Sequence, residues 1–224
     1  MVYKKVQGSA PVAAGRRRNK FPMASEGWPF VVPLLGGGLL LWIAGFTVAS
    51  VSLMLLAGGV ALFFRDPERF PPPVAGAILA PADGRVVRIG PPVDGRVGTE
   101  VSIFLSLFDV HINRAPYAGR IEEVLPSPGT FQVAWKEEAS RQNAQTLIRI
   151  KGGSLDIFVR QVAGILARQI VTWVRPGQEV QAGERIGMIR FGSRVDLLLP
   201  EGVHPGVQIG DRVRGGESVI GVVS

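Results

Sequence analysis

The chain has 224 residues, a formal net charge of +7 and no cysteine. This length suits one domain of ordinary size with an appendage. The missing cysteines exclude disulfides, thiolate metal sites and cysteine nucleophiles. With only two histidines, His111 and His204, a multi-histidine metal centre is not expected either, so we predict a site without metal.

The positive charge is concentrated at the N-terminus. Residues 1–26 carry six Lys or Arg against one Glu, and residues 27–64 carry no charged side chain. The net charge of residues 65–224 is therefore only +2. A basic tail suits nucleic acid or an anionic membrane surface. Because the region behind the tail is nearly neutral, nucleic-acid binding is not favoured, and we expect an anionic phospholipid membrane as partner.

The uncharged stretch 27–64 reads "GWPFVVPLLGGGLLLWIAGFTVASVSLMLLAGGVALFF". One bilayer crossing takes about 20 apolar residues, so the stretch predicts two helices, roughly 28–45 and 47–64, that cross and return. Lys and Arg on both flanks place both ends in the cytoplasm by the positive-inside rule. Two alternatives remain open: a hairpin that dips into one leaflet, since Pro33 and the glycines 36–38 weaken the first helix, and a buried helical pair of a soluble protein.

Behind the hydrophobic stretch the pattern changes. "RDPERFPPP" predicts a stiff, extended connector, because proline fixes φ and biases its predecessor away from helix. Residues 74–224 then read mainly as strands, with segments such as "GRVVRI", "EVSIFLSL", "TLIRIKG", "SLDIFVRQVAG", "VDLLLP" and "SVIGVV" bounded by Gly, Pro and Asp. The segment "ILARQIVTWV" fits a short helix or a strand.

An internal repeat occurs at an offset of 33 residues. "GQEVQAGERI" (177–186) matches "GDRVRGGESV" (210–219) in the form G-x-x-V-x-x-G-E-x-[IV], which is typical of the hairpins in flattened barrels of lipoyl and biotinyl carriers. Carriers need a Lys at a hairpin tip in a Met-Lys-Met setting, which is absent from the sequence. We therefore predict a mainly β (α+β) fold, a flattened β-barrel or sandwich with lipoyl-like hairpin repeats, preceded by an N-terminal hydrophobic helical hairpin.

Three polar residues could carry chemistry. Asp83 lies in "APADGRV", His111 in "FLSLFDVHINRAP" and Ser193 in "RFGSRVD". A nucleophilic serine needs a base within hydrogen-bond reach and a carboxylate that orients the base, and the chain order of the three does not matter. Each has an ordinary alternative: Asp83 as a turn residue, His111 as a buried histidine and Ser193 as a strand-edge serine. His204 is expected to be a surface turn residue.

The four motifs "RDPER-PPP", "APADGRV", "FLSLFDVHINRAP" and "RFGSRVDLLLP" together resemble, in the same order over about residues 62–224, the phosphatidylserine decarboxylases in their short bacterial form. The resemblance implies that the proenzyme cuts itself between Gly192 and Ser193, into a large chain 1–192 and a small chain 193–224. It also implies a pyruvoyl group derived from Ser193 that forms a Schiff base with the substrate, and an Asp83, His111 and Ser193 set.

The resemblance further implies the decarboxylation of phosphatidylserine to phosphatidylethanolamine and CO₂ by a lyase. The domains would be a basic tail 1–26, a membrane-anchoring hairpin 27–64 and a catalytic domain 65–224 on the cytoplasmic side of the cell membrane. A homo-oligomer is compatible with the sequence.

One position departs from the longer members of that family, which carry His-x-x-His where this chain has His111 and Arg114. An arginine is a poor base, so either His111 serves both cleavage and decarboxylation or the base for cleavage lies elsewhere. We expect Arg114 to bind the substrate phosphate or carboxylate, with an ordinary surface arginine as the alternative. The rival functions are the same chemistry on another serine lipid or on an amino acid, and a membrane-anchored β-rich adaptor without catalysis.

Overall fold

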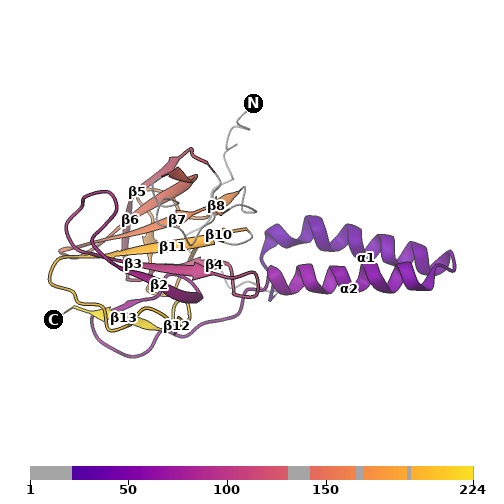
Figure 1. Ribbon diagram of the computed structural model, residues 1–224, viewed down its shortest axis with the longest axis horizontal. Helices are drawn as coiled ribbons and strands as arrows, with labels where there is room; N and C mark the ends of the chain where they lie inside the picture. Colours follow the sequence, from indigo (N-terminus) through magenta and orange to yellow (C-terminus); the bar gives the residue numbers. More distant parts are fainter. Residues whose placement is uncertain (1–21, 131–141, 165–168, 191–192, 224) are drawn as a thin grey trace.

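The computed structural model describes residues 22–130, 142–164, 169–190 and 193–223, shown in colour in Figure 1. Most of the basic tail and Gly192 lie outside the described residues. Two long helices project from a β-rich body (Figure 1). A short 3-10 helix, η1 (Ser25–Gly27), precedes α1 (Trp28–Ile43) and α2 (Thr47–Phe63). The predicted helical hairpin is confirmed, with helices that end one to two residues before the predicted limits.

The helices pack closely because small residues line their contact. A Cβ added at Gly38 would lie 3.2 Å from Cγ of Met54, and the Ser50 hydroxyl donates a hydrogen bond to the carbonyl of Gly38 at 2.7 Å. Small side chains let two helix backbones approach in this way. Gly37 and Gly38 therefore serve the pairing, whereas Gly36 faces away from α2, and α1 continues through Pro33.

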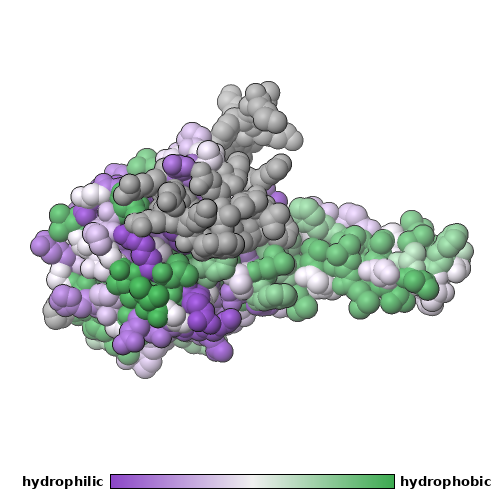
Figure 2. Space-filling view, viewed as in Figure 1, coloured by the Kyte–Doolittle hydropathy of each residue, from purple (hydrophilic) through white to green (hydrophobic). Residues whose placement is uncertain are grey.

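The outer surface of the pair is apolar, as Figure 2 shows. The segment Ser25–Ile43, 19 residues, is long and apolar enough to cross a membrane, and Thr47–Phe63 is apolar but shorter. Exposed apolar side chains run to the tip, where Ile43 is 75 % exposed. At about 1.5 Å per residue, α1 is about 24 Å long, against about 30 Å for a hydrocarbon core.

The body consists of three sheets. The largest, curled sheet has the strand order β12-β2-β3-β11-β7-β6-β5-β9, a second has the order β4-β10-β8, and β1 pairs with β13. All pairings between these strands are antiparallel. The strands are β1 (Ala77–Leu79), β2 (Gly84–Gly90), β3 (Thr99–Leu105), β4 (Ile112–Arg114), β5 (Gly119–Ser127), β6 (Gln145–Gly152), β7 (Leu155–Val162), β8 (Ile170–Thr172), β9 (Glu179–Val180), β10 (Arg185–Ile189), β11 (Ser193–Leu199), β12 (Arg212–Val213) and β13 (Val219–Val222).

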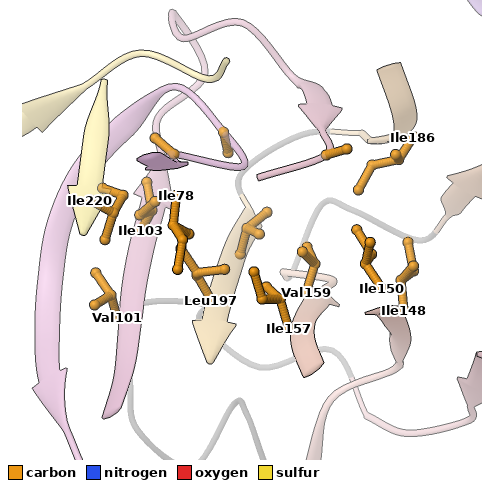
Figure 3. Packing of buried hydrophobic residues seen from close by; sticks show 14 of the residues in the cluster. Ile78, Val101, Ile103, Ile148, Ile150, Ile157, Val159, Ile186, Leu197 and Ile220 are labelled. Atoms are coloured by element: carbon orange, nitrogen blue, oxygen red, sulfur yellow. The ribbon is translucent and has the colours of Figure 1, made fainter. Parts of the chain in front are cut away.

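This architecture confirms the predicted mainly β fold behind a helical hairpin. In the ambiguous segment "ILARQIVTWV" residues 170–172 form strand β8, whereas 165–168 lie outside the described residues. The core lies inside the curl of the sheet, where β-branched side chains from facing strands meet, among them Ile103, Ile157 and Ile220 (Figure 3). Alternation along each strand sends every second side chain to this face.

The repeat at offset 33 belongs to a larger duplication. "APADGRV" (80–86) is matched by "APYAGRI" (115–121), and each half of the repeat docks on one of these segments. Gly216 donates its N–H to Ala80 as Gly183 does to Ala115, both at 2.8 Å. The large sheet is accordingly symmetric in its strand order. Counted inward from the two edges, β12 corresponds to β9, β2 to β5, β3 to β6 and, at the centre, β11 to β7.

The duplication is broken at one place. In one half, β6 runs into β7 through a tight turn, with Gly152 paired to Leu155. In the other half β3 and β11 are paired in the same way, but the chain between them makes β4 to β10 before it returns. Ser193, the first residue of β11, therefore stands where the other half has a hairpin turn.

Candidate active site

Ser193 is held in the middle of the large sheet. It opens β11, which is flanked by β3 on one side and β7 on the other, and it pairs with Leu105 at the end of β3. Alternation along β11 puts Ser193 on the same face as Val195, which belongs to the core. The serine is fully buried, so its side chain lies inside the protein and not at an exposed strand edge.

His111 is brought to the same region by two connections. The chain leaves β3 at Leu105 and reaches His111 six residues later. The carbonyl of His111 then accepts a hydrogen bond from the N–H of Ile189, four residues before Ser193, at 3.4 Å. This hydrogen bond ties the end of β10, just before the Gly192–Ser193 bond, to His111, although Gly192 itself lies outside the described residues.

The imidazole of His111 has a defined tautomer. Its Nδ1 lies 2.9 Å from the backbone carbonyl oxygen of Asp109. A carbonyl oxygen can only accept, so Nδ1 carries the proton and Nε2 keeps the lone pair that a general base needs. Burial lowers the pKa of His111 to about 4, against the smaller raising influence of Asp109. The ring is therefore neutral at pH 7.

Nε2 of His111 and Oγ of Ser193 are among the buried side-chain polar atoms that have no hydrogen-bond partner in the part of the chain that the structure describes. Leaving a buried polar group unpaired costs about 1–3 kcal/mol, and a catalytic role is one of the reasons for which a native protein keeps such an atom. The atoms are the basic nitrogen of one residue and the nucleophilic oxygen of the other. A pyruvoyl group made from Ser193 would fit this site, because the side chain that must react is buried and uncommitted.

The base of the helix pair closes the site on one side. The ring of Phe63, at the end of α2, lies 4.3 Å from the ring of His111, centroid to centroid. The Phe63 ring belongs to a second apolar cluster, which joins the helices to β4 and β10 and is separate from the main core. Its buried members are Met23, Ala24, Val31, Phe63, Phe64, Val110, Ile112 and Met188.

Asp83 has other partners than His111. Its carboxylate accepts a hydrogen bond from the Arg69 guanidinium at 2.8 Å and another from the N–H of Gly215 at 2.8 Å. Burial raises the pKa of Asp83 above its ordinary value, while Gly215 and Arg69 act in the opposite sense. The aspartate thus ties the connector after the helices to the second repeat.

Asp109 influences both Asp83 and His111. Its negative charge raises the pKa of Asp83 and partly offsets the lowering of the His111 pKa by burial. Its backbone carbonyl orients the imidazole. Its carboxylate accepts hydrogen bonds from the N–H and the hydroxyl of Ser106, at 2.8 and 2.6 Å. Sequence reasoning missed Asp109, although its place two residues before the histidine was visible in "FDVH".

Arg114 is buried, and its guanidinium is engaged within the protein. It donates to the carbonyls of Gly183 and Pro67 at 3.0 and 2.7 Å and lies 3.4 Å from Asp66. Burial lowers the pKa of Arg114 to about 10. This geometry favours a structural role over the expected contact with substrate. The connector "RDPER" is accordingly more than a spacer, because its Asp66 is buried between Arg114 and Arg185.

The outer face of β11 carries buried charges. Asp196 lies 2.9 Å from Arg194 and 3.7 Å from Arg160 of β7, which also pairs with Glu100 of β3 at 2.8 Å. Burial and the neighbouring Asp196 raise the pKa of Glu100. The ion pairs join β11 to β7, and join β7 to β3 across β11. His204 lies exposed in the loop after β11, as expected.

Comparison with known proteins agrees with this arrangement. The family described as phosphatidylserine decarboxylase matches residues 56–221. A phosphatidylserine decarboxylase proenzyme of Chlorobium luteolum is 44 % identical over 176 residues, which cover 77 % of this chain and 83 % of the relative. Proenzymes of the same name from Desulfotalea psychrophila (38 % identical, 90 % and 97 % covered) and Nitrosomonas eutropha (41 %, 88 % and 94 %) are also similar. The chain belongs to the phosphatidylserine decarboxylase family.

Proposed function

We propose that this protein is a membrane-bound proenzyme that cuts itself between Gly192 and Ser193 and then decarboxylates phosphatidylserine to phosphatidylethanolamine and CO₂. The observation that supports the proposal most directly is the pair of buried, unpartnered atoms, Ser193 Oγ and His111 Nε2. The names of the similar proteins supply the substrate.

In the cleavage step, Nε2 of His111 accepts the hydroxyl proton of Ser193 as Oγ attacks the carbonyl carbon of Gly192. The Gly192–Ser193 C–N bond breaks, the freed nitrogen takes the proton from the imidazolium, and Gly192 is left as an ester on Oγ. Loss of the Ser193 α-proton then expels the Gly192 carboxylate, and one water hydrolyses the resulting enamine to a pyruvoyl group and ammonia. Because the neutral tautomer of His111 has its lone pair on Nε2, one residue suffices as the base.

A pyruvoyl group at the start of the small chain supplies a ketone that captures the substrate amine and withdraws electrons as CO₂ leaves. The buried His111, whose Nε2 has no hydrogen-bond partner among the described residues, would return a proton to the substrate carbon. Asp83 supports the site by fixing the turn at Gly215 and the connector at Arg69. Arg114 holds the connector in place through Pro67 and Asp66.

The architecture also accounts for how the products would stay together. The new terminus at Ser193 is the first residue of β11, which is hydrogen-bonded to β3 and β7 of the large chain. The small chain 193–224 would contribute β11, β12 and β13 and remain part of the fold. Large chain 1–192 and small chain 193–224 would thus form one enzyme.

The helix pair would anchor the protein in an anionic phospholipid membrane. Its exposed apolar surface and its uncharged sequence support this role. The basic residues of the tail would keep both helix ends and the catalytic domain at the cytoplasmic face of the cell membrane. Each Lys or Arg close to an anionic leaflet contributes about 1 kcal/mol of attraction.

Intact mass measurement tests the proposal. The purified protein should separate under denaturing conditions into chains of 192 and 32 residues, and the smaller should resist Edman degradation and be reduced by borohydride, because a pyruvoyl group has no amine. Ser193→Ala should stay uncut and inactive. Ser193→Cys should cut slowly, since a thiol can make the same acyl shift. A Ser193→Ala protein that decarboxylates phosphatidylserine would overturn the proposal, and a wild-type protein that stays as one chain would favour an adaptor.

A further inference from the structure

The loop between β3 and β4 exposes two apolar side chains at its tip. Leu107 is 49 % exposed and Phe108 is 85 % exposed. The residues on either side close a tight turn beneath them, because Ser106 donates both its N–H and its hydroxyl to the carboxylate of Asp109. The tip is therefore presented outward by a fixed turn, next to the residue whose carbonyl orients His111.

One side chain ties this tip to the base of the helix pair. The guanidinium of Arg65 donates from Nη2 to the carbonyl of Phe108 at 2.5 Å and from Nη1 to the carbonyl of Leu62 at 2.8 Å. Leu62 lies in the last turn of α2. The tip is thus held at the end of the helices that faces the β-rich body, where a bilayer surrounding the helices would have its surface. In Figure 1 the loop that leads into β4 reaches this end of α2.

Cationic groups surround the same place. The Arg190 guanidinium lies 5.6 Å and 6.0 Å from the ring centroids of Phe30 and Phe64 at the helix base. Arg212, 72 % exposed, lies 3.6 Å from Asp109. Together with Arg65 they place positive charge beside exposed apolar side chains, the combination that suits the headgroup layer of an anionic leaflet.

We propose that the tip formed by Leu107 and Phe108 is a second membrane contact, which inserts into the interfacial layer of an anionic bilayer beside the helix base. The inference rests on the proposed function, in which the helices lie in the membrane. The contact holds the loop that carries His111 against the lipid surface, so that a phospholipid headgroup reaches the site while its acyl chains stay in the bilayer.

The absence of cysteine from the whole chain allows a direct test. Phe108→Cys gives a single thiol for an environment-sensitive NBD label. Val97→Cys is the matched control, because Val97 is 73 % exposed in the loop before β3, at the other end of the same strand. Leu55→Cys, 73 % exposed in α2, reports on the anchor itself. Each full-length protein is reconstituted in vesicles of phosphatidylglycerol and phosphatidylcholine.

The label at position 108 should shift to the blue and be quenched severalfold more by doxyl-labelled lipids than the label at position 97. Quenching at 55 without quenching at 108 would overturn this inference and leave the anchor standing. Quenching at none of the three would refute the membrane part of the proposed function. A blue shift at 108 that is present in detergent and insensitive to doxyl lipids would indicate a protein contact and would also overturn the inference.

Kinetics provide a second measurement. Phe108→Ser should raise the KM for phosphatidylserine in vesicles severalfold and leave self-cleavage complete. With short-chain phosphatidylserine dispersed in detergent the same variant should match the wild type. An unchanged KM in vesicles would count against the contact even if the protein is fully cut and active.

Discussion

The ring of Phe63 lies 4.3 Å from the ring of His111, tilted by 41°. Phe63 ends the second helix of the hydrophobic pair, whereas His111 belongs to the β-rich body. The contact makes the last turn of the helices a wall of the candidate active site. The helix pair therefore does more than tether the body, because removing it would open the buried imidazole to water.

We predict that Phe63→Ala raises the pKa of His111 from about 4 towards its ordinary value near 6.5, because burial is the main cause of its lowered pKa. Histidine NMR signals of the uncut Ser193→Ala protein in detergent would show the change. The chain has only two histidines, so His204 provides the second signal. Asp109 and Arg65 are the charged neighbours that also influence His111, and both remain in the variant.

The control for this prediction is Phe64→Ala. Phe64 is also buried and stacks on Phe30 at 5.7 Å between ring centroids, so its loss should weaken the helix base without uncovering His111 to the same extent. Phe63→Leu should keep the pKa low, because an apolar cover remains. An equal rise in Phe63→Ala and Phe64→Ala would show that the contact with Phe63 has no special role.

A second prediction concerns acid stability. His111 has a pKa of about 4 when folded and an ordinary value near 6.5 when unfolded, so the unfolded chain binds the extra proton between these pH values. The stabilisation is complete above pH 6.5 and is lost as the pH falls towards 4, by about 3 kcal/mol in total. Replacing the histidine by His111→Gln should remove this part of the pH dependence of the free energy of unfolding.

Denaturant unfolding of Ser193→Ala with and without His111→Gln, at steps between pH 7 and 4, would measure the difference. Comparing the two proteins is necessary because Asp83 and Glu100 have raised pKa values, which favour the folded state as the pH falls. If the free energies of unfolding of the two proteins changed with pH in the same way, His111 would not be buried as a neutral ring.

Much of the fold follows from short-range sequence patterns. The uncharged stretch of apolar residues predicted the helix pair, and β-branched segments between Gly and Pro predicted the strands. The repeat at 177–186 and 210–219 predicted two similar turns. Its partner segments, 80–86 and 115–121, were missed because the match, four identical positions and one Val/Ile pair in seven, becomes evident only when both segments accept the same hydrogen bonds.

The site was less predictable because its contacts join distant parts of the chain. Motif resemblance pointed to Ser193 and His111, which the structure leaves with unpartnered atoms. It could not show that Asp83 faces Arg69, or that Phe63 of the helices covers the imidazole. Arg114 illustrates the difficulty most clearly, since one motif position cannot show whether a guanidinium faces substrate or carbonyl oxygens inside the protein.

A third prediction separates two roles of Asp83. If the aspartate acts through its ion pair, Arg69→Ala should lower the free energy of unfolding by about 3 kcal/mol, because it leaves the largely buried Asp83 without its cation. Asp83→Ala should lower it by less, because Arg69 keeps its ion pair with Glu217. The two changes together should cost less than their sum. Both single variants should slow self-cleavage, as measured by the fraction of uncut chain. Normal cleavage in Arg69→Ala with none in Asp83→Ala would instead assign Asp83 a direct part in the chemistry.

A fourth prediction concerns the cleaved protein. The 32-residue small chain should co-elute with the large chain on size exclusion in mild detergent, because β11 is paired on both sides. Arg160→Met leaves Glu100 and Asp196 without the guanidinium that lies between them, so it should let the small chain dissociate at a lower urea concentration. Release of the small chain from the wild type without denaturant would contradict the central position of β11.

The last prediction concerns the contact between the two helices. A side chain at Gly38 would lie 3.2 Å from Met54 and 3.5 Å from the carbonyl of Ser50, whereas one at Gly36 would meet nothing within 4 Å. Gly38→Val should therefore push the helices apart and lower the thermal stability of the protein in detergent, while Gly36→Val, on the same helix with the same substitution, should have little effect. Since Phe63 lies at the end of the displaced helix, Gly38→Val should also shift the His111 NMR signal. Equal melting temperatures for the two variants would show that the glycines do not set the distance between the helices.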